Sequence, residues 1–137
     1  MTTSTTIDFI AGGDLPDQWL MVLVEEGPWP APLDSELRRI QDRLYGSVDA
    51  ALDGLLANDF PESLGKDILI RLDCYDLPEA EVGAFFDRFS DGVFLSEDYK
   101  EALQQSRFVK SISFEIRFKS LKGEGSEAPQ ERDRKEP

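Results

Sequence analysis

Short apolar runs along the chain predict four β-strands, at residues 7–11, 19–24, 67–76 and 110–118. The second run is apolar on both alternating phases, which predicts an interior strand of a sheet, buried on both faces. The last run alternates cleanly from Ile112 onward, which predicts a strand with one face in solvent. Glycine and proline clusters come after each of the first two runs, and they indicate turns.

Between the second and third runs, apolar residues recur at steps of three and four, which predicts one long amphipathic helix. Its apolar positions are Leu33, Leu37, Ile40, Leu44, Val48, Ala51 and Leu55. Asp34 or Ser35 is expected to cap its start and Asn58 to mark its stop. Two weaker patterns predict short helices over residues 77–89 and 96–103.

The order of elements, ββαβααβ, predicts the fold class and the domain organisation. We expect an α+β fold in which one long and two short helices pack on one face of a four-stranded, mostly antiparallel sheet. Residues 1–120 form this single domain. Residues 121–137 mix charges with glycine and proline and are predicted to be a disordered charged tail.

The charge balance narrows the choice of partners. The chain of 137 residues has 15 basic and 28 acidic side chains, a net charge of −13. Such a charge repels nucleic acid and anionic membranes and accelerates encounter with basic proteins. One cysteine cannot form an internal disulfide, and neither a signal peptide nor a membrane-spanning run is visible, so a cytoplasmic location is expected.

The candidate chemistry is sparse. Without histidine, Ser–His–Asp and Cys–His nucleophiles are excluded, and one cysteine cannot build a zinc site. Cys74 shares its phase with Ile70 and Leu72, which predicts a core residue. The close acidic pairs fall in no recognised motif, although the sequence leaves open whether one of them binds a metal. The sequence therefore predicts no catalytic residue and no cofactor, and we expect the protein not to be an enzyme.

Six residues are candidates for contact with a partner. Glu25 and Glu26 end the second strand, and Trp29 lies just beyond them within a proline-rich connector. Trp29 either staples this connector to the core or presents an anchor to a partner. Asp42, Asp49 and Asp53 lie on the face of the long helix opposite its apolar positions.

The segment from Trp29 through Ile40-Gln41-Asp42-Arg43-Leu44 to Pro61 resembles a bacterial family of small proteins of unknown function. In that family a Trp-ending loop precedes an LQ-[DE]-[KR]-[LI] helix. Tyr45 here replaces the family's usual Asn. The resemblance implies a compact α+β bacterial protein without a catalytic signature.

These observations favour a non-enzymatic acidic protein-binding module. The most concrete form is a bacterial immunity protein that neutralises a basic toxin by electrostatic occlusion. The alternatives are a secretion chaperone for an effector, a carboxylate-metal hydrolase, and a structural domain with no dedicated partner. The expected partner is a protein, neither nucleic acid nor membrane, and the chain is expected to be a monomer or a homodimer.

Overall fold

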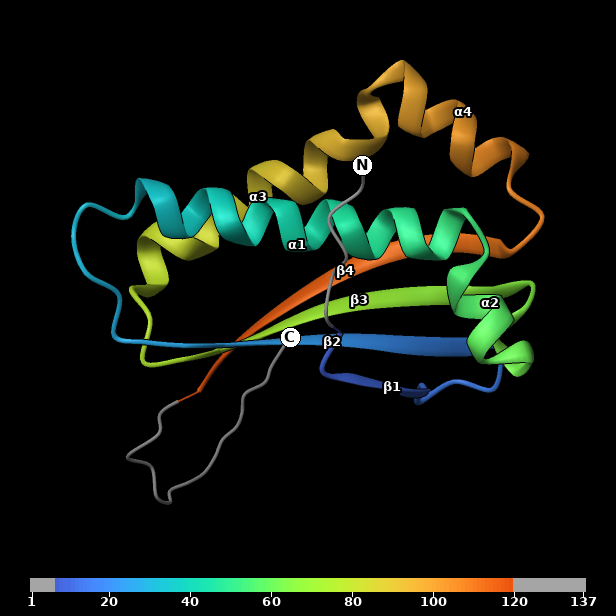
Figure 1. The fold of residues 1–137 in the computed structure, drawn as a ribbon, viewed down its shortest axis with the longest axis horizontal. Coiled ribbons are helices and arrows are strands. Elements are labelled where there is room, and N and C mark those ends of the chain that lie inside the picture. Colours follow the sequence, from blue (N-terminus) through green and yellow to red (C-terminus); the bar gives the residue numbers. More distant parts are fainter. Residues whose placement is uncertain (1–6, 120–137) are drawn as a thin grey trace.

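The computed structural model describes residues 7–119, so the predicted tail lies outside the described residues. Strands and helices alternate after an initial pair of strands (Figure 1). The elements are β1 (Phe9–Gly12), β2 (Gln18–Glu26), α1 (Asp34–Leu52), α2 (Leu55–Asp59), the 3₁₀ turn η1 (Pro61–Ser63), β3 (Lys66–Tyr75), α3 (Glu79–Gly92), the 3₁₀ turn η2 (Val93–Leu95), α4 (Glu97–Gln105) and β4 (Val109–Lys119). The predicted strands and short helices are all present, with ends shifted by up to three residues.

The four strands form one sheet in the order β1-β2-β3-β4. Only β1 and β2 pair antiparallel, whereas β2, β3 and β4 run parallel. The prediction of a mostly antiparallel sheet is therefore wrong. Each helical connection returns the chain to the end of the sheet where the previous strand began, so the next strand starts there and runs in the same direction.

All the helices cover one face of the sheet (Figure 1). The central residues of β2 and β3 that face them are buried, and the helices supply the opposing apolar side chains. This core includes Met21, Leu23, Ile40, Leu44, Val48, Ile68, Ile70, Leu72, Val82 and Phe86. The other face carries no helix, so Leu20 and Val24 of β2 are only half-buried there. β2 is an interior strand as predicted, and Val22 on its helix-free face is buried, but the predicted burial of that face fails at Leu20 and Val24.

The long helix is shorter than its apolar pattern predicts. α1 ends at Leu52, and Gly54 adopts a left-handed φ of 94° before α2 begins at Leu55. A Cβ at Gly54 would lie 2.8 Å from the ring of Phe108, which packs against this break. Neither Asp34 nor Ser35 caps α1, because Leu33 occupies the cap position without a side-chain hydrogen bond.

Candidate functional site

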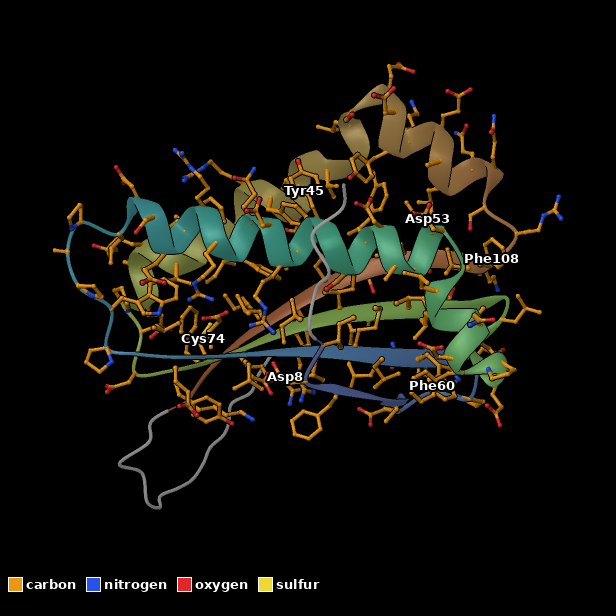
Figure 2. All side chains as sticks on the ribbon, in the orientation of Figure 1. Asp8, Tyr45, Asp53, Phe60, Cys74 and Phe108 are labelled. Carbon is orange, nitrogen blue, oxygen red and sulfur yellow. The ribbon has the colours of Figure 1, made fainter. Side chains whose placement is uncertain are left out.

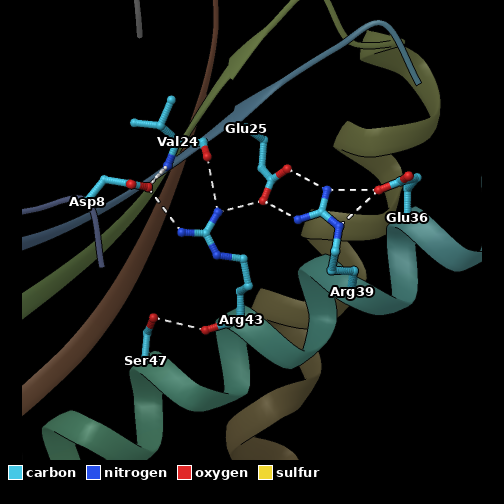
Figure 3. Close-up of polar contacts among 7 residues, drawn as sticks. All are labelled: Asp8, Val24, Glu25, Glu36, Arg39, Arg43 and Ser47. Atoms are coloured by element: carbon cyan, nitrogen blue, oxygen red, sulfur yellow. Dashed lines mark hydrogen bonds and ion pairs between the residues drawn. The ribbon is translucent and has the colours of Figure 1, made fainter. Parts of the chain in front are cut away.

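A network of ion pairs joins α1 to β2 and to Asp8, which precedes β1 (Figure 3). Glu25 near the end of β2 is only 4 % exposed, and its carboxylate accepts hydrogen bonds from Arg39 at 2.7 and 2.9 Å. Arg43 donates to Glu25 at 2.6 Å and to the Val24 carbonyl at 3.1 Å. It also donates to Asp8 at 3.1 Å. The arginines one turn apart on α1 therefore hold the helix against β2.

The opposite charges of this network stabilise one another in their ionised forms. Burial by itself raises the pKa of the Glu25 carboxyl, but the hydrogen bonds and positive charges of Arg39 and Arg43 outweigh burial and leave this pKa lowered. The same contact raises the pKa of Arg39. Glu25 is thus an ionised, internally satisfied carboxylate. Its burial and its arginine partners leave it little capacity to contact another protein.

The neighbouring candidates Glu26 and Trp29 lie in different settings. Glu26 is exposed at the end of β2. Trp29 is half-buried against the core, with the Arg39 guanidinium 5.9 Å from its ring centroid. This packing supports the interpretation that Trp29 staples the proline-rich connector to the domain.

The other candidates are Asp42 and Asp49 of α1 and Asp53, the residue that directly follows α1, and we call these three the acidic ridge. Asp42 and Asp53 are exposed, whereas Asp49 is half-buried and accepts a hydrogen bond from the Tyr99 hydroxyl of α4 at 2.9 Å. Burial raises the pKa of Tyr99, and the hydrogen bond and charge of Asp49 raise it further. Tyr99 therefore remains a protonated donor and ties α4 to the ridge.

An aromatic hollow of about 340 Å³ lies beside this ridge, between α1 and α3. Its walls are Gln41, Tyr45, Phe85, Arg88, Phe89, Gly92 and Val93. Tyr45, labelled in Figure 2, lies between Asp42 and Asp49 along α1. Its ring packs edge-on against Phe89 at 4.9 Å and lies 5.4 Å from Tyr99. The hollow is therefore preformed by packed aromatic rings.

Sequence reasoning missed this hollow, because its walls come from two helices separated by β3. The pattern over residues 77–89 predicted a short helix but no hollow beside it. Tyr45 carried a signal as the departure from the resembled family, but nothing in the sequence indicated that it faces Phe89.

The helices around the hollow are rich in acidic residues. Their basic residues are few: Arg38, Arg39, Arg43, Arg88 and Lys100. Their acidic residues are Asp34, Glu36, Asp42, Asp49, Glu79, Glu81, Asp87, Asp91, Glu97, Asp98 and Glu101, and Asp53 directly follows α1. Since Arg39 and Arg43 are engaged by Glu25, the outward surface of the helical layer is strongly negative.

Cys74 lies in the core, as its phase predicts (Figure 2). Its side chain is fully buried, and burial raises the pKa of the thiol to about 12, with contributions from the negative charges of Asp73 and Glu25. At neutral pH such a thiol is neither a nucleophile nor a metal ligand. Among residues 7–119, no group of three or more Cys, Asp or Glu side chains is arranged to hold a metal ion.

No family model, curated protein or solved structure matches the chain. The resemblance carried by Trp29, residues 40–44 and Pro61 thus stays a prediction. None of the helices in the described part of the chain is both long and apolar enough to cross a membrane.

Proposed function

We propose that the chain is a non-enzymatic binding module that engages a basic protein through the acidic ridge and the aromatic hollow. The supporting observation is that the exposed Asp42 and the half-buried Asp49 flank Tyr45, a wall of the preformed hollow, on a helical layer rich in acidic residues. The specific role proposed is that of a bacterial immunity protein that neutralises a toxin.

The composition of this surface suits protein recognition. Interfaces typically place aromatic side chains at their centre and charged groups at their rim. The rings of Tyr45, Phe85 and Phe89 can pack on the aliphatic stem of an entering lysine or arginine. Asp42 and Asp49 flank Tyr45 and can pair with the positive head group. Arg88 supplies donors for the partner's backbone carbonyls.

The net charge of −13 adds a long-range effect. It accelerates encounter with a basic partner by about 10- to 1,000-fold at low ionic strength. Once bound, the ridge carboxylates occupy the positions that phosphate groups would take on a toxin that acts on nucleic acid. The toxin is then neutralised because its nucleic-acid-binding surface is blocked, and this chain needs no catalytic residue.

The first experiment identifies the partner and then measures its association. The tagged full-length protein is used to capture partners from the native lysate at low salt, and proteins released by rising salt are identified by mass spectrometry. Association kinetics are then measured with the captured protein. We expect Asp42→Lys combined with Asp53→Lys to slow association by about 10- to 100-fold.

The matched control reverses the same number of charges elsewhere. Asp14 and Glu62 are exposed and lie outside the helical layer, so Asp14→Lys combined with Glu62→Lys should slow association much less. Equal losses in both variants would show that net charge alone acts and would remove the ridge from the proposal. An affinity that does not change with salt would remove the electrostatic mechanism.

A further inference from the structure

Within residues 7–119, the strand β4 forms an open edge of the sheet. It is the last strand in the order β1-β2-β3-β4, its described residues pair only with β3, and Figure 1 shows it at the margin of the sheet. At 11 residues it is the longest strand. Long open edges present unpaired backbone groups that can pair with another strand.

The pairing of β4 with β3 determines which backbone groups of β4 point outward. The Lys119 carbonyl accepts from the Asp76 amide of the β3 side at 3.4 Å, with Lys119 in register with Tyr75. In a parallel pair, alternate residues bond to the neighbour and the residues between them point away. The amides and carbonyls of Ile112, Phe114, Ile116 and Phe118 therefore point outward, and within residues 7–119 no backbone group of a turn, loop or cap bonds to them.

We propose that this edge pairs with the β4 edge of a second copy of the chain, antiparallel and centred on Ile116, to form one continuous sheet across a homodimer. A two-fold axis at Ile116 places this residue opposite the partner's Ile116. The same axis places Phe114 opposite the partner's Phe118. All of these residues have outward backbone groups, so they form the hydrogen-bonded pairs of an antiparallel ladder.

The charges on the helix-free face favour this register. Glu115 falls opposite the partner's Arg117, and by symmetry Arg117 falls opposite the partner's Glu115. These positions are the non-hydrogen-bonded pairs, where cross-strand side chains come closest. Within one chain Arg117 already donates to Glu115 at 3.0 Å, and their side chains are 46 % and 37 % exposed. Both groups are thus available at the surface.

Other registers place like charges opposite one another or leave these charges without a partner. Pairing centred on Phe118 would place Arg117 opposite the partner's Lys119, and like charges directly opposite each other are destabilising. Pairing centred on Phe114 would place Glu115 opposite the partner's Ser113, without a charge partner. An in-register parallel pair would stack Glu115 on Glu115. The charge pattern of the strand therefore selects the antiparallel register at Ile116.

The helix-facing side chains add apolar contacts. Phe114, Ile116 and Phe118 are only half-buried in the single chain. In the proposed pairing Phe114 packs against the partner's Phe118 across the new ladder, so the core extends through the interface. Aromatic cross-strand pairs are among the more favourable in antiparallel sheets.

The test uses charge reversal in the full-length protein at about 0.15 M salt, where surface charges are screened beyond about 8 Å. Sedimentation equilibrium should give twice the chain mass of 15.5 kDa for the wild type. Glu115→Arg alone and Arg117→Glu alone should each weaken self-association by about tenfold or more, because each places like charges opposite one another. An equimolar mixture of the two variants should restore the dimer as a heterodimer.

The control is Asp14→Arg, an exposed charge reversal at the β1–β2 turn on the opposite side of the sheet, which should leave the dimer unchanged. A wild type that stays monomeric at every concentration would overturn the proposal and leave the edge to an extended segment of another protein. A dimer that withstands both single reversals, or a mixture that fails to recover association, would overturn this interface.

Discussion

A buried carboxylate such as Glu25 is stable only where its lost hydration is replaced. Desolvating one ion costs several kcal/mol, and pairing with hydrogen-bonding cations offsets that cost. Arg39 and Arg43 meet both oxygens of Glu25 at 2.6–2.9 Å. Removing the carboxylate charge would leave two guanidinium groups close together without their shared counter-ion.

We therefore expect Glu25→Gln to lower the free energy of unfolding at pH 7 by about 3 kcal/mol. Glu36→Gln is the matched control, because Glu36 pairs with the same Arg39 at the more exposed end of the network and should cost less than about 1 kcal/mol. Urea unfolding monitored by circular dichroism measures both. Equal costs would contradict the structural role of Glu25.

The pH dependence of stability has a definite sign. The folded pKa of Glu25 lies below its ordinary value of 4.5, so the unfolded chain binds this proton more readily. The contribution of Glu25 is present above pH 4.5 and is lost as the pH falls through the lower folded pKa. The difference in unfolding free energy between the wild type and Glu25→Gln should therefore narrow steadily below pH 4.5. A constant difference would show that the folded pKa is not lowered.

Cys74 should be chemically silent in the native protein. Its burial and a pKa of about 12 leave almost no accessible thiolate at pH 8. A thiol-reactive chromophore is expected to label the native protein at least about 1,000-fold more slowly than the chain unfolded in guanidinium. The measurement is the labelling rate as denaturant rises, and it should track the unfolding transition. Rapid labelling without denaturant would contradict the core assignment.

Cys74 and Glu25 show which properties of a single residue can be predicted from the sequence. The burial of Cys74 can be inferred from its alternation with Ile70 and Leu72, which needs only local information. Whether Glu25 is free to contact a partner depends on arginines of α1 that lie 14 and 18 positions away in the sequence. No local sequence pattern indicates that these residues pair with it. Sequence reasoning therefore identified Glu25 as a candidate for partner contact, whereas the fold engages it internally.

Among the elements, the long helix shows how an apolar pattern can continue through a break. Leu52, Leu55 and Leu56 maintain the helical spacing across Asp53 and Gly54, so periodicity alone predicts one helix. The left-handed φ of Gly54 ends α1 and lets the Phe108 ring approach the backbone. Glycine is the residue that tolerates both conditions.

Gly54→Ala should lower the free energy of unfolding by about 3 kcal/mol, from backbone strain together with the contact between the new Cβ and Phe108. Gly65→Ala separates these causes, because Gly65 has a φ of 75° but no atom within 4 Å of a new Cβ. It should cost only about 1 kcal/mol. Similar costs in a thermal or urea melt would show that the approach of Phe108 carries no energy.

The direction of the strands is the part of the fold that element patterns alone did not provide. Each strand was located within a few residues from its own apolar run, but neither composition nor alternation fixes its direction. The length of the connections does: a helix as long as α1 or α3 spans the sheet and brings the chain back to its starting end. Applied to the predicted order, that rule gives the parallel pairing of β2, β3 and β4.

At the scale of the whole molecule, the two proposed associations use different surfaces. The acidic ridge and hollow lie on the helical layer, whereas the dimer uses the β4 edge. Both can therefore be occupied at once, and a dimer would offer two ridges to partners. A dimer also gives weight to the alternative of a secretion chaperone, since a paired surface can hold an extended effector segment. The identity of the captured partner then distinguishes an immunity protein, which would bind a toxin, from a secretion chaperone, which would bind an effector.

Salt should affect these associations in opposite directions. Two chains of charge −13 repel one another over a distance of about 30 Å at 0.01 M salt but only about 8 Å at 0.15 M. The exposed pairs between Glu115 and the partner's Arg117 lose less than about 1 kcal/mol over this range. Screening should thus strengthen self-association. Binding to a basic partner is an attraction between opposite charges, so the same screening should weaken it.

We would measure sedimentation of the chain alone and association kinetics with its partner, each at about 0.01 M and about 0.15 M salt. Self-association should be stronger at the higher salt concentration, and partner association should be slower. If salt weakened both, self-association would have to be dominated by local ion pairs and not by the repulsion of two acidic molecules.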